Sequence, residues 1–465
     1  MKIYQKLPEL KILLSFPLLF GSTSIMSQQK PNIVFILADD LGYGDLACYG
    51  NKVIQTPNID KLADEGVKFT QGYAGASVSS PSRSCLMTGL HTGHTRIRGN
   101  MCRVGGIVGE REGMGTVRRT NLQPQDTTIA NVLSNNGYIT CLVNKWHLDG
   151  FDPTATPLDR GFTEFYGWLI REPRSHNYYP DIRYNNREEY EIQENANGTH
   201  IDHNTDRSTS EAIDFLNRQT NDKPFFLYLA YNVPHVPLDA KDSGIYSDMK
   251  NLTDNDKAYA ALITHMDECI GRVMMALQSN GQLENTMVVF ASDNGGAKAA
   301  NIKNLPPINS NLRGWKGELY EGGLRAPIII RMPDKTSAGE VSDYPCYFPD
   351  FFSTFVDFTA SRTGVETDGI SLLPEIKKVG SQPRERFLYW EQFPNKGISQ
   401  AVRWGKWKMI RSNIDKPYVL YNLKNDESET KDIAENYPDV VRTIADYMKA
   451  AHIESENWPI FIKEK

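Results

Sequence analysis

The sequence predicts an α/β fold in which a mostly parallel sheet lies between layers of helices, followed by a small C-terminal α+β unit. Four apolar runs rich in β-branched and aromatic residues cover 32–38, 139–143, 225–230 and 287–292. Uninterrupted runs of this length are typical of strands that are covered on both faces. Helical patterns separate the runs, and this alternation favours βαβ units and a parallel sheet.

Two helices between these strands have clear sequence signals. The first covers 58–65, where a proline precedes the segment and a glycine follows it. The second covers 257–280 and places Leu262, Met266 and Ile270 on one apolar stripe. Both helices are therefore predicted to pack one face against the sheet.

The C-terminal unit is predicted to begin after a polar stretch at 377–386, which contains two helix breakers. This stretch divides the chain into a catalytic domain at 28–378 and a C-terminal subdomain at 379–465. The subdomain is predicted to hold short antiparallel strands at 387–390, 401–404, 407–411 and 419–423 and a helix at 439–451.

The N-terminus resembles an export signal. Lys2, Lys6 and Lys11 precede an apolar run at 12–21, and small residues follow it, which predicts a signal peptide at 1–27. The run is too short to span a bilayer and no later run is long enough, so no stable membrane insertion is expected. We therefore expect a periplasmic or secreted protein.

Length and charge limit the possible functions further. A chain of 465 residues is long enough for one large domain and a smaller one. Its net charge of −6 gives no electrostatic reason to expect nucleic acid as a partner. An anionic substrate would therefore need a local pocket of basic residues.

The six cysteines contain no CxxC pair and no zinc-ligand spacing. Their even number in an exported protein permits disulfides, which the sequence alone cannot pair. We interpret them mainly as buried residues, and Cys48, Cys85 and Cys102 are the ones most expected to be linked.

Acidic and amide side chains follow two of the predicted strands. Asp39 and Asp40 come after the first strand, and Asp293 and Asn294 come after the fourth. One Asp-Asp pair is usually a turn or a helix cap. Two such pairs at matching strand ends favour a metal site, because ligands bind beyond the C-terminal ends of parallel strands. Oxygen ligands alone suit calcium or magnesium better than zinc.

A third helix is predicted to begin at Ser79 and to end before Gly89. A helix N-terminus presents free backbone N–H groups and favours a tetrahedral oxyanion. Arg83 in its first turns adds a fork of donors that suits sulfate or phosphate. A capped surface helix explains this segment equally well when it is considered alone.

Four basic residues complete the candidate site. Lys145 and His147 follow the second strand, His235 follows the third, and Lys316 precedes a glycine-rich turn. Each alone would be interpreted as structural or solvated. His176 is a weaker candidate for lining a sugar pocket, although an ordinary loop explains it better, and the same holds for its neighbours Arg174 and Asn177.

With these motifs in place, the sequence resembles the type I, formylglycine-dependent sulfatases of the alkaline phosphatase superfamily, in particular serine-type bacterial carbohydrate sulfatases. The resemblance runs from PNIVFILADDLGYGD at 31–45 to RWGKWKMI at 403–410, and its strongest element is SSPSRSCLMTG at 79–89. That element is the signal for oxidation of its first residue to formylglycine (3-oxoalanine). The first residue is Ser79 rather than cysteine, which implies maturation by a serine-type radical-SAM sulfatase maturase as a partner.

The resemblance implies a large mixed, mostly parallel sheet of the alkaline phosphatase type. It also implies a Ca²⁺ ion held by Asp39, Asp40, Ser79, Asp293 and Asn294. The catalytic residues that it implies are Ser79, Arg83, Lys145, His147, His235 and Lys316. Lys145, His235, Lys316 and, on the weaker argument above, His176 would bind the substrate. Two departures lie in one loop, where Asn144 replaces the usual glycine and Asp149 is inserted before Gly150.

The implied function is hydrolysis of sulfate monoesters by attack of a formylglycine hydrate on sulfur. His147 would assist the hydrate, and His235 with Lys316 would protonate or stabilise the leaving oxygen. The expected substrate is a sulfated glycan attacked from its end, with a galactose or N-acetylgalactosamine sulfate. A phosphatase or phosphodiesterase using unmodified Ser79 is the main alternative, and it would need a second cluster of Asp and His ligands. A non-catalytic glycan-binding relative would be expected to have lost some of these residues.

Overall fold

The computed structural model describes residues 30–111, 114–172, 177–220, 222–334, 337–394 and 397–461. The predicted signal peptide at 1–27 lies outside the described residues. Within them, one large sheet has ten strands. In their spatial order these are β13 (Glu340–Ser342), β2 (Val67–Phe69), β12 (Ile328–Arg331), β11 (Thr286–Ser292), β1 (Asn32–Ala38), β10 (Phe225–Ala230), β6 (Ile139–Lys145), β7 (Glu164–Trp168), β8 (Ile182–Asn185) and β9 (Glu188–Glu191).

The centre of this sheet is parallel and its flanks are mixed. Strands β11, β1, β10, β6 and β7 pair in parallel, and Ile36 of β1 lies between Phe290 of β11 and Leu229 of β10. β12 pairs antiparallel with β11, and β8 pairs antiparallel with β7. The four predicted strands are the four at the centre of the sheet, and the predicted mixed, mostly parallel architecture is confirmed.

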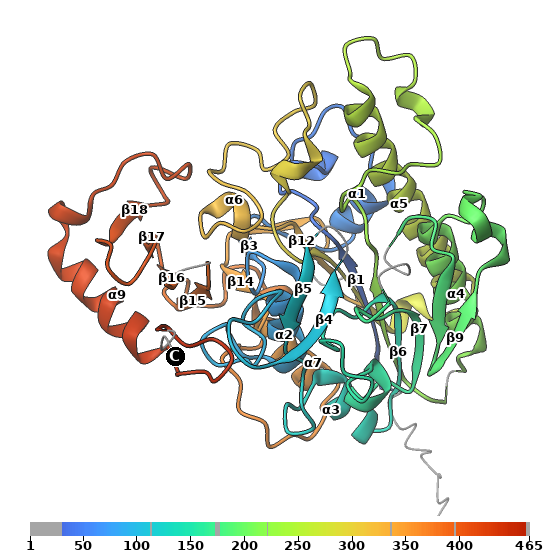
Figure 1. The fold of residues 1–465 in the computed structure, drawn as a ribbon, viewed down its shortest axis with the longest axis horizontal. Coiled ribbons are helices and arrows are strands. Elements are labelled where there is room, and N and C mark those ends of the chain that lie inside the picture. The colour runs from blue at the N-terminus through green and yellow to red at the C-terminus, as the bar shows by residue number, and fades with distance from the viewer. Residues whose placement is uncertain are drawn as a thin grey trace, which may run out of the picture.

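Helices cover both faces of the sheet, as Figure 1 shows. Side chains of β1 alternate between two cores: Val34 and Ile36 contribute to one, and Phe35 and Leu37 to the other. The first core includes residues of α1 (Pro57–Asp64), α4 (Asn204–Arg218) and α5 (Asp254–Ser279). The second includes residues of α2 (Ser79–Thr88), α3 (Ile129–Asn135), α7 (Asp350–Phe358) and α8 (Leu373–Lys377). Burial on both faces explains the uninterrupted apolar strands.

The C-terminal part forms an antiparallel sheet and a helix, at one side of the large sheet in Figure 1. Its four strands are β15 (Phe387–Gln392), β16 (Ser399–Trp404), β17 (Trp407–Arg411) and β18 (Val419–Asn422). Helix α9 (Pro438–Ala450) packs Ile444 and Met448 against Val402 and Met409 of this sheet. The predicted strands and helix are confirmed, whereas the boundary between residues 378 and 379 stays a prediction.

Smaller elements complete the described part. They are the strand pair β3 (Gly72–Tyr73) and β14 (Cys346–Tyr347), the hairpin β4 (Ile107–Arg111) and β5 (Gly115–Arg119), and the short helix α6 (Glu321–Leu324). Among the described residues, no helix is both long and apolar enough to cross a bilayer.

The expected link among Cys48, Cys85 and Cys102 is wrong. All six cysteines are described, and all are free thiols. Cys85 lies inside the buried helix α2 with its Sγ atom 3.6 Å from the Gly75 carbonyl, and the Cys102 Sγ atom lies 3.6 Å from the Gly105 carbonyl. These thiols face backbone carbonyls instead of one another, so they act as small buried side chains.

Candidate active site

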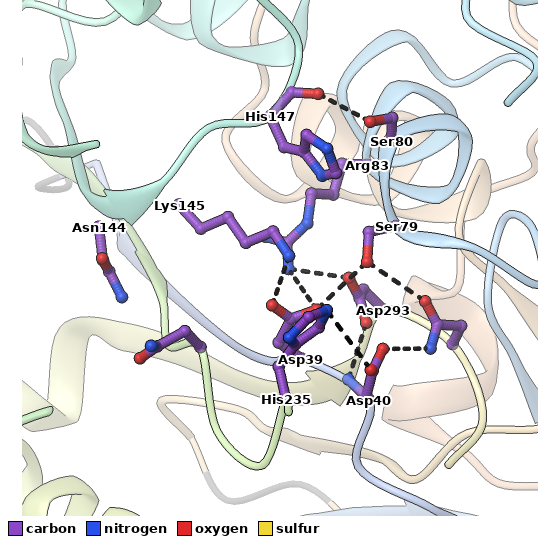
Figure 2. A network of polar contacts seen from close by, with 12 residues as sticks. Asp39, Asp40, Ser79, Ser80, Arg83, Asn144, Lys145, His147, His235 and Asp293 are labelled. Atoms are coloured by element: carbon purple, nitrogen blue, oxygen red, sulfur yellow. Dashed lines mark hydrogen bonds and ion pairs between the residues drawn. The ribbon is translucent and has the colours of Figure 1, made fainter. Parts of the chain in front are cut away.

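The C-terminal ends of β1, β6, β10 and β11 meet at one edge of the sheet, where helix α2 begins (Figure 2). Asp39 and Asp40 follow β1, and Asp293 and Asn294 follow β11. All four side chains are buried, as is Ser79 at the first position of α2. The sheet topology therefore brings together the two acidic strand ends and the helix N-terminus that the sequence indicated separately.

Ser79 lies against this acidic cluster. Its Oγ atom donates to Asp39 Oδ1 at 3.2 Å and to Asn294 Oδ1 at 3.4 Å. The Asn294 amide donates its Nδ2 hydrogens to Asp40 Oδ1 and to the Gly295 carbonyl, which turns its oxygen towards Ser79. Asp293 Oδ1 accepts from the Asp40 backbone N–H at 3.1 Å. Several oxygen atoms thus converge beside Ser79.

This donor set fits a hard divalent cation. Carboxylate, carbonyl and hydroxyl oxygens are hard ligands, which suit calcium or magnesium. One ring nitrogen of His235 and one carboxylate oxygen each of Asp39 and Asp40 lie within 4.8 Å of one another, close enough to share a metal ion. The Nδ1 atom of His235, however, is 2.6 Å from the Val236 carbonyl.

Three basic side chains surround the cluster. Arg83 donates from Nη2 to Asp293 Oδ2 at 2.8 Å and lies 3.6 Å from Asp39 Oδ1. Lys145 forms a short ion pair with Asp39, and Lys316 Nζ lies 2.6 Å from Asp40 Oδ1. Arg83 and Lys145 are buried, whereas the Lys316 side chain is 18% exposed at the cavity. An anion that enters beside Ser79 would therefore meet three cations.

The carboxylates repel one another inside this water-poor cluster. Burial and the adjacent Asp39 carboxylate raise the pKa of Asp293 to about 6. Burial alone would raise the pKa of Asp39 too, but Lys145 and the other nearby cations hold it well below its ordinary value. Burial lowers the pKa of Lys145. A divalent cation among these oxygens would relieve the repulsion that raises the pKa of Asp293.

Replacement of Arg83 by methionine is expected to destabilise the fold by about 3–5 kcal/mol, because it leaves the buried Asp293 carboxylate without the cation that pairs with it. Urea unfolding measured in the absence of divalent cations tests this expectation. Arg331→Met is the matched control: Arg331 is equally buried, but its partners Glu65 and Glu284 are 27% and 65% exposed and can be solvated. Equal losses of unfolding free energy in the two variants would contradict the prediction.

His147 lies in a loop with unusual backbone geometry. Its φ is +62°, and Asn144 just before the motif has φ +78°. Asparagine tolerates this left-handed region better than most residues. This explains why Asn144 can stand where the family that the sequence resembles usually has glycine. Asp149 is buried and accepts from the Ile170 backbone N–H at 3.2 Å, so it ties the loop to the end of β7. Both departures therefore leave Lys145 and His147 at the site.

The cavity above Ser79 shows which further residues sequence reasoning missed. Ser79, Lys145, His147, His235 and Lys316 line it, together with Asn177 and with residues that had no recognisable motif: Asn100, Glu110, Arg111, Arg119, Phe151 and Trp168. Hairpin β4–β5 contributes three of these, and no periodic pattern marks a hairpin of mixed polarity. His176 and Arg174 lie outside the described residues, so their placement stays a prediction.

Two other groups of histidine and aspartate occur in the described part of the chain, His91, His94 and Asp368, and His203, Asp206 and His265. None of them lines the cavity of Ser79. In each group one histidine uses Nδ1 to accept a backbone N–H, from Gly93 to His91 and from Thr205 to His203. That bond places the proton of the neutral ring on Nε2. A protonated nitrogen has no lone pair for a metal, so these groups are better explained as structural contacts.

This chain is similar to known sulfatases over most of its length. A family model described as Sulfatase matches residues 31–361, and one for the C-terminal region of N-sulphoglucosamine sulphohydrolase matches residues 314–454. Arylsulfatase J of Mus musculus is 28% identical over 468 residues, which cover 89% of this chain and 74% of the relative. The N-acetylgalactosamine-6-sulfatase of Canis lupus familiaris is 30% identical over 424 residues, which cover 83% and 75%.

Solved structures extend the similarity over the fold. The crystal structure of Ps i-CgsB in complex with k-i-k-neocarrahexaose superimposes with a TM-score of 0.78 at 29% identity, and covers 93% of this chain and 95% of that chain. The sulfatase model alone matches well over half of the sequence, and its match spans the segment from Asp39 to Lys316. This chain therefore belongs to the sulfatase family.

Proposed function

We propose that this protein hydrolyses sulfate monoesters of glycans at Ser79 after its conversion to formylglycine. The observation that carries the proposal is the position of Ser79 at the N-terminus of a buried helix, against acidic oxygens and within reach of three basic side chains. Sulfate is a tetrahedral oxyanion, which suits a helix N-terminus and a fork of guanidinium donors. A serine-type radical-SAM maturase is the partner that would make the modification.

The Ser79 Oγ atom in the structure stands for a hydroxyl of the mature residue. Formylglycine supplies a hydrated aldehyde, one hydroxyl of which attacks sulfur while the other allows sulfate to be expelled. A Ca²⁺ ion held by Asp39, Asp40, Asp293, Asn294 and position 79 would supply positive charge beside that hydroxyl. Unmodified serine lacks the second hydroxyl and would remain trapped as a sulfate ester.

The protein's own side chains neutralise the charge of the reacting group. Arg83 and Lys145 are held rigidly by buried carboxylates, so their donors need no rearrangement when the substrate binds. Lys316 lines the cavity and contacts Asp40. Its exposure leaves it free to exchange that contact for a sulfate oxygen, which supports a substrate-binding role.

His235 is the proposed acid at the leaving oxygen. Its Nδ1 atom faces the Val236 carbonyl, so Nε2 is the nitrogen turned towards the cluster, 3.8 Å from Asp40 Oδ2. Because Nε2 faces the cluster, it is the nitrogen proposed to transfer the proton.

Replacement of His235 by alanine is expected to slow sulfate release from a sugar about 10²–10⁴-fold. The same change is expected to slow hydrolysis of 4-nitrophenyl sulfate less than about tenfold, because nitrophenolate leaves without a proton. Comparison of kcat/KM for the two substrates tests the role. His200→Ala is the control, since His200 lines the neighbouring pocket. Equal losses on both substrates would assign His235 to binding alone.

We further propose an exported, periplasmic or secreted enzyme that removes sulfate from galactose or N-acetylgalactosamine at the end of a glycan chain. The N-acetylgalactosamine-6-sulfatases among its relatives support the sugar class. The aromatic ring of Phe151 in the cavity offers a flat apolar surface for a pyranose ring.

The test is mass spectrometry of the Ser79 peptide from protein made with and without a serine-type maturase, combined with sulfate release from a panel of sulfated sugars. A loss of two hydrogens, about 2 Da, that appears only with the maturase and accompanies sulfate release is the expected result. Phosphate-ester cleavage by unmodified protein would instead establish the phosphatase alternative.

A further inference from the structure

Hairpin β4–β5 holds an arginine against a histidine of the site. Arg119, the last residue of β5, is buried at 3% exposure and donates from Nη1 to His147 Nε2 at 3.1 Å. The same Nη1 donates to the Asn100 carbonyl at 2.8 Å. Asn100 in turn accepts from the backbone N–H of Ser80 through its side-chain oxygen, at 2.9 Å. One short network thus connects the hairpin, His147 and the residue next to Ser79.

The guanidinium has little freedom to move. The centroid of the Phe151 ring lies 5.5 Å from Arg119 Cζ, a cation–π contact. Phe151 itself packs on β4, where a Cβ atom added at Gly109 would lie only 2.8 Å from the ring. The backbone also joins the two segments, because the Leu122 N–H donates to the Leu148 carbonyl at 3.2 Å. The position of Arg119 relative to His147 is therefore set by packing on several sides.

A guanidinium donates hydrogen bonds and cannot accept them. His147 Nε2 must therefore present its lone pair to Arg119, and the proton of the neutral ring lies on Nδ1. We propose that Arg119 is a positioning residue that fixes the ring of His147 in the neutral Nδ1–H form. This inference rests on the proposed function only for its consequence, since the tautomer itself is independent of the reaction.

The Arg119 cation opposes protonation of the His147 ring. Burial lowers the pKa of Arg119 to about 10, so this residue stays charged at neutral pH. A cation in contact with the ring opposes a second positive charge on it. Other titratable groups that line the cavity include Glu110, Arg111, Lys145, His235 and Lys316, and Asp149 interacts with Arg119.

Nitrogen NMR of the full-length protein with ¹⁵N-labelled histidine tests the inference without any activity. The expected spectrum contains an Nδ1–H signal that is lost in His147→Gln, beside the Nδ1–H signals of other histidines such as His235. His91 is an internal reference for the opposite form, because its Nδ1 accepts from the Gly93 N–H. An Nε2–H ring at His147 in the wild-type protein would overturn the proposal.

Arg119→Met is expected to release the ring. The neutral ring of His147 is then expected to mix both tautomers and to take up a proton more readily as the pH falls. Arg119→Lys keeps a donor-only cation and is expected to keep His147 neutral. Arg118→Met is the matched control, because this neighbour points to the Gly105 carbonyl and is exposed. An unchanged His147 signal in Arg119→Met would also overturn the proposal.

The kinetic consequence is measured in matured enzyme, after mass spectrometry has shown equal formylglycine content in each variant. Arg119→Met is expected to lower kcat about 10–100-fold with a smaller change in KM, and Arg119→Lys to recover most of that loss. A fall in formylglycine content alone, with an unchanged tautomer, would assign Arg119 to folding or maturation. Absence of sulfatase activity in every sample would contradict the proposed function and leave the tautomer result intact.

Discussion

Replacement of Ser79 by alanine is expected to reduce sulfate release by about 10⁴-fold or more, with the fold intact. The expected loss is large because a covalent nucleophile has no substitute in the site, and the neighbouring cations can bind sulfate but cannot attack it. The fold should survive because Ser79 Oγ makes only two hydrogen bonds, of 3.2 and 3.4 Å, to groups that keep other partners. Sulfate release from a sulfated sugar and thermal unfolding of the same samples measure the two effects.

Two further variants separate the loss of the nucleophile from other effects. Ser84→Ala is the matched control, because Ser84 is a buried serine of the same helix whose hydroxyl pairs with Thr95 at 2.6 Å, away from the cluster. It should lose stability and retain modification and activity. Ser79→Cys should regain activity only with a maturase that accepts cysteine, because both residues give the same aldehyde. Sulfate release by Ser79→Ala within tenfold of the wild type would refute Ser79 as nucleophile.

The parts of the fold that could be predicted are those in which local sequence and tertiary environment agree. Strand β1 reads as a strand because every residue from Asn32 to Ala38 is buried between two helical layers, so no polar residue interrupts the run. Helix α2 could be predicted to end at Gly89, because that residue has φ +71°, which glycine adopts without strain. Asp39 and Asp293 could be placed together because neighbouring parallel strands end at the same edge.

The parts that could not be predicted depend on contacts distant in sequence. Hairpin β4–β5 has the burial pattern of an exposed ribbon, with only Val117 and Arg119 buried, so it carries no apolar alternation. The importance of Arg119 comes from contacts with Asn100, His147 and Phe151, none of which its own neighbours in the sequence indicate. Short flanking strands such as β2 and β13 are stabilised by pairing with β12 and with each other, and three residues carry too little pattern to predict.

The error over the cysteines has a similar origin. Cysteine count and cellular compartment bear on whether disulfides are possible, but only the positions of the Cβ atoms decide whether two thiols can meet. Cys85 points from the buried helix α2 to the Gly75 carbonyl, and Cys102 contacts a carbonyl three residues ahead in its own turn. Both orientations are set by local backbone structure that composition does not report.

Removal of calcium is expected to lower sulfate release about 10³-fold and to destabilise the protein. At a free ion concentration 100 times the dissociation constant, the ion should add about 2.7 kcal/mol to the free energy of unfolding, because it binds the folded cluster and not the unfolded chain. The buried carboxylates that raise the pKa of Asp293 supply the physical reason: without the ion, their mutual repulsion remains. Thermal unfolding and sulfate release after chelation, and then after titration with calcium or magnesium, measure the effect.

Asp40→Asn offers a substitution that removes charge without backbone strain. Asp40 has φ +67°, in the left-handed region that asparagine adopts readily, so the variant should fold and bind calcium with about 10–100-fold lower affinity. Asp267→Asn is the matched control, because Asp267 is a buried acid that accepts from the backbone N–H groups of Asn58 and Ile59, far along the chain from the cluster. It should lose stability and keep the calcium titration of the wild type. Calcium should restore activity better than magnesium, since calcium accepts an irregular set of protein oxygens whereas magnesium demands near-ideal octahedral geometry. Full activity in protein shown by elemental analysis to be free of divalent ions would exclude the metal, and full recovery with magnesium alone would assign the site to the smaller ion.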